Sequence, residues 1–150
     1  MAGDGGDVKE VGCINKSADE STNNDAVLSD DSELIISVAI NEVILLKSVI
    51  YFTCNVASGI RIALNGPAAT TSIRSYAFMY DSTGAISSGI AASYGIYALL
   101  IGGISGHCII ESTIENGANA GNIAVQWAQH TSNANNTTVE RGSYIKWYRL

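Results

Sequence analysis

Short alternating segments separated by turn residues are the feature that most constrains the fold of this chain. In residues 122–129, Ile123, Val125 and Trp127 occupy every second position, with small or polar residues between them. A period of two is that of a β-strand with one buried face. Similar segments recur about every ten residues, and none has the period and caps of a long helix. The sequence therefore predicts an all-β domain.

The spacing of the segments favours a single jelly-roll or β-sandwich of about eight antiparallel strands. A two-sheet jelly roll is the first choice, and an immunoglobulin-like sandwich is second because no Cys…Trp…Cys pattern supports it. Asn41-Glu42 predicts a hairpin between the first two strands, and 85–93 suits a strand or a surface loop. The expected strands are 34–40, 43–54, 60–64, 73–80, 94–101, 104–114, 122–129 and 143–150.

The first 33 residues differ in composition from the remainder. They hold nine acidic residues against Lys9 and Lys16, a balance of −7, whereas 34–150 carries +1. Their few apolar residues follow neither a helical nor a strand period. We therefore expect two parts, an extended acidic N-terminal arm (1–33) and a jelly-roll β-domain (34–150). Such an arm becomes ordered by lying on other protein, and a flexible solvated terminus is the alternative.

The composition limits the partners. Only 15% of the residues are charged and 47% are hydrophobic, so part of the surface is expected to lie against other protein, most simply a second copy of this chain. The sequence has no basic cluster that could follow a phosphate backbone, which argues against nucleic acid. It has no signal-peptide pattern and no apolar run of membrane-spanning length, so no membrane partner is expected.

The residues that could carry chemistry form no recognisable site. Cys13, Cys54 and Cys108 lack a CxxC spacing, and the two histidines are His107 and His130. We expect free buried thiols in a reducing compartment, no metal and no cofactor. Adjacent strand residues point to opposite faces, so His107 and Cys108 cannot form a thiol–imidazole pair. No catalytic residue is predicted, and we expect that the protein is not an enzyme.

Aromatic residues are concentrated in the last two expected strands. Trp127 and Trp147 fall on the apolar faces and are predicted to be core. Tyr144, Lys146 and Tyr148 alternate to the other face, and tyrosine is enriched where proteins meet. Together with the apolar residues of the arm they form the predicted interface. The candidate interface residues are Val8, Val11, Ile14, Val27, Leu28, Tyr144, Lys146 and Tyr148.

The end of the chain resembles a family of virion proteins. The pattern I-x-V-x-W-A-Q-x-x-S-(x)5-T-V-x-x-G-S-Y-I, at Ile123 to Ile145, is similar to the C-terminus of many structural proteins of tailed bacteriophages. The segment from Lys16 to Asn24 and the run Ala63 to Pro67 look similar too. The resemblance extends from about Lys16 to the C-terminus, but residues 70–120 carry no recognisable part of it.

This resemblance implies a jelly-roll protein of the phage particle, similar to trimeric capsid decoration (cement) proteins. Such a protein sits on the capsid exterior, is made in the host cytoplasm and bridges neighbouring major capsid subunits, with its arm contacting adjacent subunits. Its partners would be itself, as a homotrimer, and the major capsid protein. The alternative is a tail, fibre or head-spike module that binds a host receptor or glycan through loops such as 85–93 and 131–136.

Overall fold

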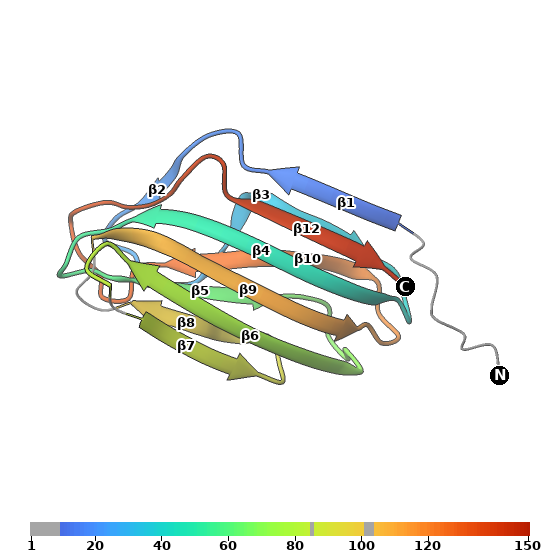
Figure 1. The fold of residues 1–150 in the computed structure, drawn as a ribbon. Coiled ribbons are helices and arrows are strands. Elements are labelled where there is room, and N and C mark those ends of the chain that lie inside the picture. Colours follow the sequence, from blue (N-terminus) through green and yellow to red (C-terminus); the bar gives the residue numbers. More distant parts are fainter. Residues whose placement is uncertain (1–9, 85, 101–103) are drawn as a thin grey trace.

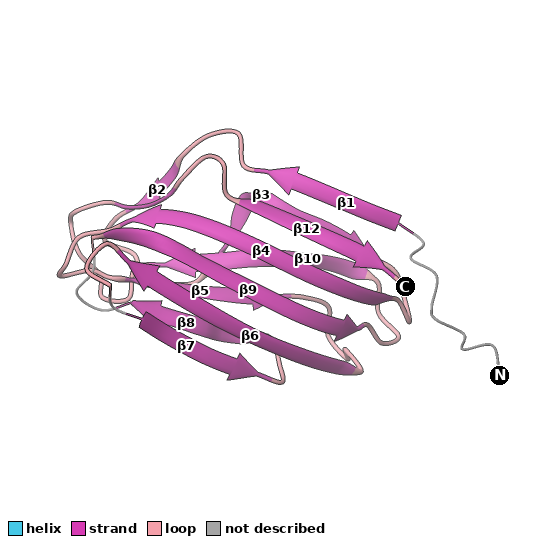
Figure 2. Ribbon diagram, in the orientation of Figure 1, coloured by secondary structure: helices cyan, strands magenta, loops and turns pink. Residues whose placement is uncertain are grey.

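The chain folds into two stacked antiparallel sheets in a computed structural model that describes residues 10–84, 86–100 and 104–150 (Figure 1). These residues form twelve strands and no helix (Figure 2). The larger sheet has the order β1-β12-β4-β9-β6-β7, with β11 also paired to β4 and to β2, and the smaller sheet has the order β3-β10-β5-β8. The predicted all-β sandwich is confirmed. The strands are β1 Glu10–Asn15, β2 Glu20–Thr22, β3 Ser29–Val38, β4 Val43–Thr53, β5 Ile60–Asn65, β6 Ser72–Asp81, β7 Ile86–Ala91, β8 Gly95–Leu100, β9 Ser105–Glu115, β10 Gly121–Ala128, β11 Thr137–Val139 and β12 Tyr144–Arg149.

The eight strands from β3 to β10 wind as a jelly roll. Counted in chain order, the first, eighth, third and sixth of them (β3, β10, β5 and β8) form the smaller sheet. The second, seventh, fourth and fifth (β4, β9, β6 and β7) lie side by side in the larger sheet. This order is that of two Greek keys folded over one core. The remaining strands, β1, β2, β11 and β12, extend the larger sheet beyond β4. The preferred jelly-roll prediction is therefore confirmed.

The predicted hairpin between the first two jelly-roll strands is wrong. β3 pairs with β10 in the smaller sheet, whereas β4 pairs with β9, β11 and β12 in the larger sheet. Residues 39–42 therefore cross from one sheet to the other, with Asn41 in the left-handed region at φ 56°. A short connection cannot by itself distinguish a hairpin from a crossing, because both strands bury one face whichever sheet they join.

The core lies between the two sheets and is filled by alternate residues of both. Ile123, Val125 and Trp127 of β10 point into it, as the period of two predicted, and Trp127 and Trp147 are both buried. Burial of such side chains supplies the main favourable free energy of folding. The largest fully buried side chains are Phe52, Leu34, Ile44, Ile50, Ile60, Ile62, Leu64, Met79, Ile110, Ile114, Ile123 and Ile145.

The described part of the acidic N-terminal segment belongs to the sandwich. β1 pairs with β12, β2 pairs with β11, and β3 begins at Ser29, so the expected strand start at Leu34 is wrong by five residues. This segment is held in place by pairing with strands near the C-terminus. Strands this short that pair with distant parts of the chain show no clear period in their own sequence. At Gly12 the backbone approaches so closely that an added Cβ would lie 2.0 Å from the ring of Trp147.

A buried ion pair fixes this N-terminal segment to both sheets. Lys16 is 2% exposed, and its Nζ donates to Asp31 Oδ1 and Oδ2 at 2.9 and 2.8 Å and to Glu20 Oε2 at 2.7 Å. Asp31 is fully buried and also accepts the indole N–H of Trp127 at 3.2 Å and the backbone N–H of Leu34 at 2.9 Å. Burial alone lowers the pKa of Lys16, but hydrogen bonds to Asp31 and Glu20 outweigh it and hold that pKa above its ordinary value.

Replacing Lys16 by Met should lower the free energy of unfolding by about 3–5 kcal/mol, because Asp31 would remain as a buried charge without its counterion. The control is Lys47→Met, which removes a pair with Glu111 whose side chains are 45% and 36% exposed. Such a pair contributes at most about 1 kcal/mol. Urea denaturation of the two variants measures both effects, and equal losses would contradict the role given to Lys16.

Stability should fall as the pH drops below about 4.5, the ordinary pKa of Glu20. Burial raises the pKa of Glu20, but hydrogen bonds from Lys16 and Ser32 outweigh it and lower that pKa in the folded state. A group whose folded pKa is lowered stabilises the fold above its unfolded pKa and loses that contribution as acid protonates it. Urea midpoints at pH 7 and pH 3 should therefore differ less in Glu20→Gln than in the wild type; an unchanged difference would contradict this assignment.

Candidate interaction surface

The larger sheet has one face on the core and the other turned away from it. Strand register aligns the side chains of this second face in four rows. We call this surface the outer face. Its rows are Tyr148-Leu45-Thr113-Arg74, Lys146-Lys47-Glu111-Tyr76-Ile90, Tyr144-Val49-Ile109-Phe78-Ser88 and Tyr51-His107-Tyr80.

Strand β6 turns its aromatic side away from the core. Its buried positions are Ile73, Ser75, Ala77 and Met79, two of which are small. Its outward positions after Arg74 are the aromatic residues 76, 78 and 80, which are 42%, 39% and 37% exposed. A monomeric protein rarely exposes a large contiguous apolar patch, so these aromatic residues make the outer face a candidate interaction surface.

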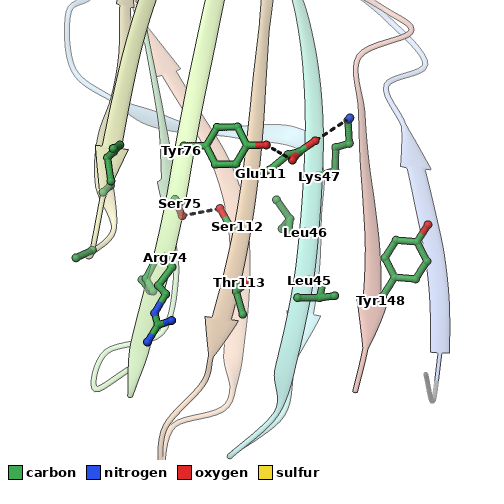
Figure 3. A pocket seen from close by; sticks show the side chains of 14 residues that line it. Leu45, Leu46, Lys47, Arg74, Ser75, Tyr76, Glu111, Ser112, Thr113 and Tyr148 are labelled. Atoms are coloured by element: carbon green, nitrogen blue, oxygen red, sulfur yellow. Dashed lines mark hydrogen bonds and ion pairs between the residues drawn. The ribbon is translucent and has the colours of Figure 1, made fainter. Parts of the chain in front are cut away.

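A groove runs across the outer face between β12 and β7 (Figure 3). It encloses about 770 Å³, and most of its exposed lining is apolar. Tyr148 stands on the β12 side, Arg74 and Tyr76 on the β6 side, and Leu45 and Thr113 lie between them (Figure 3). The groove can therefore hold an apolar side chain, and Arg74 places a basic group at the margin of the groove.

Three polar side chains cross the floor of the groove and support its shape. Lys47 Nζ lies 2.8 Å from Glu111 Oε1, and Tyr76 donates its hydroxyl to the other oxygen of the same carboxylate. Figure 3 shows Tyr76 reaching from β6 and Lys47 from β4 toward Glu111 on β9. The hydrogen bonds from Lys47 and then Tyr76 hold the pKa of Glu111 below its ordinary value. These bonds keep the ring of Tyr76 in place across the strands.

Ring contacts order the rest of the outer face. The rings of Tyr80 and His107 stack with centroids 5.2 Å apart, and Tyr51 lies 6.3 Å from the same imidazole. Tyr76 and Phe78 meet edge to face at 5.4 Å. Aromatic pairs prefer these offset and edge-on geometries. The surface is thus preformed, so little side-chain entropy would be lost when a partner binds.

The structure brings together some of the predicted interface residues and separates others. Tyr144, Lys146 and Tyr148 lie together on the outer face, and Val11 is paired in register with Tyr148 and is 54% exposed. Their role in an interface remains a prediction. The other described members are elsewhere, and Val8 lies outside the described residues. Val27 is exposed and Leu28 half-buried between β2 and β3, and Ile14 packs against the core.

Most residues of the outer face were not predicted from the sequence to be part of an interface. The alternation in 73–80 was a usable signal, because it groups the three aromatic residues of β6 on one side. A period of two does not say which side is buried, and the aromatic side looks like the better core. The apolar and aromatic residues of the outer face that were not predicted from the sequence are Leu45, Tyr51, Tyr76, Phe78, Tyr80, Ile90 and Ile109.

The described residues assemble no cluster that suggests a metal or a thiol site. They contain no group of three or more His, Cys, Asp or Glu able to hold a metal ion. None of the three cysteines forms a disulfide, but Cys13 is exposed, so the prediction of a buried thiol is wrong there. Burial raises the pKa of the Cys54 and Cys108 thiols to about 11 and about 12, which leaves both as unreactive thiols at neutral pH.

Within the described ranges, no helix is long and apolar enough to cross a membrane.

Substitutions on the two sides of β6 should separate core from surface. Met79→Ala should cost about 2–5 kcal/mol of unfolding free energy, because Met79 is fully buried and its loss leaves a cavity. Phe78→Ala, one residue away and on the outer face, should cost less than about 1.5 kcal/mol despite the larger side chain removed. Chemical denaturation compares them, and a larger loss for Phe78→Ala would contradict the assignment of faces.

Comparisons with known proteins find only distant structural likenesses. No protein-family model matches the chain, and no curated protein matches it. Among solved structures, a chain of the infectious bursal disease virus Gt strain aligns with 10% identity and a TM-score of 0.25, covering 94% of this chain and 42% of that chain. A chain of the Gx strain of the same virus aligns with 9% identity and a TM-score of 0.24, covering 95% of this chain and 41% of that one. The chain thus spans less than half the length of these viral chains, and its function has to be argued from its own surface.

Proposed function

We propose that the protein is a structural component of a tailed-phage particle, a trimeric capsid decoration protein that bridges neighbouring major capsid subunits. The sequence pattern at Ile123–Ile145 supports the virion assignment by resemblance. The observation that carries a role in assembly is the outer face, where the larger sheet presents a group of exposed aromatic side chains. The jelly roll is compatible with this role but does not by itself imply it.

The composition of the outer face suits contact with protein. Tyrosine and other aromatic residues are enriched in the cores of interfaces. Six of the seventeen residues in its rows are aromatic, and of its four charged residues Lys47 and Glu111 are paired with each other. A preformed aromatic surface provides the central anchors on which binding energy concentrates.

In this proposal the protein acts mechanically. A decoration protein makes contacts at many equivalent positions of the shell, so moderate affinity at each position adds to a large resistance against expansion. The inter-subunit contacts expected of a free arm have to be reassigned, because residues 10–33 are built into the sandwich by β1, β2 and β3. We propose that exposed side chains of this segment, such as Val27, make those contacts from a fixed position.

Recognition of a receptor glycan is the second candidate. It is favoured by one observation, that Tyr76 and Tyr148 stand in the groove together with the polar groups of Arg74 and Glu111. Aromatic rings and a few placed polar groups are what a sugar site needs. The mainly apolar lining of the groove favours a protein partner instead.

Electron cryo-microscopy of purified particles tests the proposed function. We expect many copies over the capsomer junctions, with the outer face covered by protein, because the aromatic side of the larger sheet needs a partner. A few copies at the tail with the groove open to solvent would contradict the decoration role and favour the receptor-binding module.

A further inference from the structure

We infer that the groove of the outer face binds the acidic segment 17–33 of a second copy of this chain, with Val27 of that copy as the apolar anchor. The contact is heterologous, so each copy offers its groove to one neighbour and its acidic segment to another. This inference deepens the proposed function and rests on the outer face being a protein interface.

The groove side of the contact is basic. The outer face carries Lys47, Arg74 and Lys146 against the single acid Glu111, a balance of +2 in a chain whose net charge is −6. Arg74 is exposed at the margin of the groove, and Lys146 lies over the ring of Tyr148 with Nζ 5.1 Å from its centroid. A partner that fits this surface brings negative charge around an apolar group.

The acidic segment has this chemistry. Residues 17–33 contain six acidic residues and no basic one. Asp31 is fully buried and Glu20 is bonded to Lys16. The carboxylates left at the surface are therefore those of Asp19, Asp25, Asp30 and Glu33. Asp19 and Asp30 are exposed, and between them Val27 exposes 74% of its surface, a large apolar side chain in an acidic surrounding. No other described part of the chain combines an exposed large apolar residue with so many carboxylates nearby in the sequence.

The loop that presents Val27 is held in shape. The backbone N–H of Val27 donates to Asp25 Oδ1 at 2.8 Å, which closes a turn around the aspartate side chain. Asp25 is joined to Gln129 twice: its N–H donates to Oε1 at 3.3 Å, and its carbonyl accepts the Gln129 N–H at 3.3 Å. The loop is thus fixed beside the end of β10 and would lose little freedom on docking.

The groove and the loop of one molecule cannot meet. The loop is fixed to the end of β10 in the smaller sheet, and the groove lies on the side of the larger sheet that faces away from the smaller one. The contact therefore joins two copies. Packing two outer faces directly together would oppose basic groups to basic groups, which is unfavourable. Two different complementary patches make a heterologous contact, and three such contacts can close into a ring with threefold symmetry.

Light scattering during size-exclusion chromatography of the purified full chain tests the inference. The wild type should elute as an assembly of several 15.7 kDa chains that dissociates at high salt, because its charged contacts are screened. Arg74→Glu, in the groove, and Val27→Asp, in the acidic segment, should each reduce the mass to that of the monomer. Circular dichroism should show that both variants remain folded, since both sites are exposed.

Matched substitutions control for general effects of charge and exposure. Arg61→Glu makes the same charge change on β5 of the smaller sheet, outside both the groove and the acidic segment, and Val56→Asp makes the same apolar-to-acidic change at a site that is 52% exposed after β4. Both should assemble as the wild type does. A wild type that is monomeric, or an assembly that survives Val27→Asp, would overturn the inference.

Mixing the two variants tests the heterologous geometry. Arg74→Glu keeps an intact acidic segment and Val27→Asp keeps an intact groove, so an equimolar mixture should form a one-to-one complex although neither variant associates alone. A mixture that stays monomeric would overturn the inference. A monomeric wild type that still decorates particles would overturn this inference and the proposed trimer but not the decoration role, whereas absence from the capsid would overturn the decoration role itself.

Discussion

The larger sheet buries one face only, and this constraint organises the whole molecule. The smaller sheet covers its inner face and completes the core, but the jelly roll provides no third layer for the other side. Side chains there include the exposed aromatic residues 76, 78 and 80 of β6. The fold is complete as a sandwich, and the proposed assembly role rests on this uncovered face.

The N-terminal segment links this surface to the rest of the fold. β1 lies at the edge of the larger sheet beside β12, and the Lys16–Asp31 pair ties the following loop to β3 and, through Trp127, to β10. Burying these charges costs free energy, and their interactions offset this cost only when every partner is in place. The network therefore favours one arrangement of the segment. The fixed segment then presents its remaining carboxylates and Val27 at defined positions, as a docking element requires.

Much of the fold could be predicted from the sequence, because its information is local. Alternation in 122–129 and in 104–114 identified strands, the apolar side of 122–129 is buried as predicted, and Trp127 and Trp147 were assigned to the core. β2 and β11 were missed because strands of three residues have no readable period and exist only through their pairing. β1 was also missed, because its sequence has no clear period of two and its partner β12 lies at the other end of the chain.

The candidate site was less accessible to prediction than the fold. Tyr144, Lys146 and Tyr148 were found because they share a strand with an evident apolar face. The aromatic residues of β6 were missed because alternation separates two sides of a strand without stating which side meets the core. The side of β6 that packs inside includes Ser75 and Ala77, whose small size fits the space between the sheets. Only the three-dimensional arrangement reveals that the aromatic side is turned outward.

Hydroxyl-radical footprinting of the assembled particle, compared with the isolated chain, tests the central claim most directly. If the outer face is a protein interface, the aromatic residues at 76, 78 and 80 will be oxidised readily in the isolated chain, dissociated at high salt, and protected in the particle. Exposed residues away from that face, such as Val56, serve as the reference. Equal oxidation of the three aromatic residues in both states would show that the outer face stays in water, and would contradict the account.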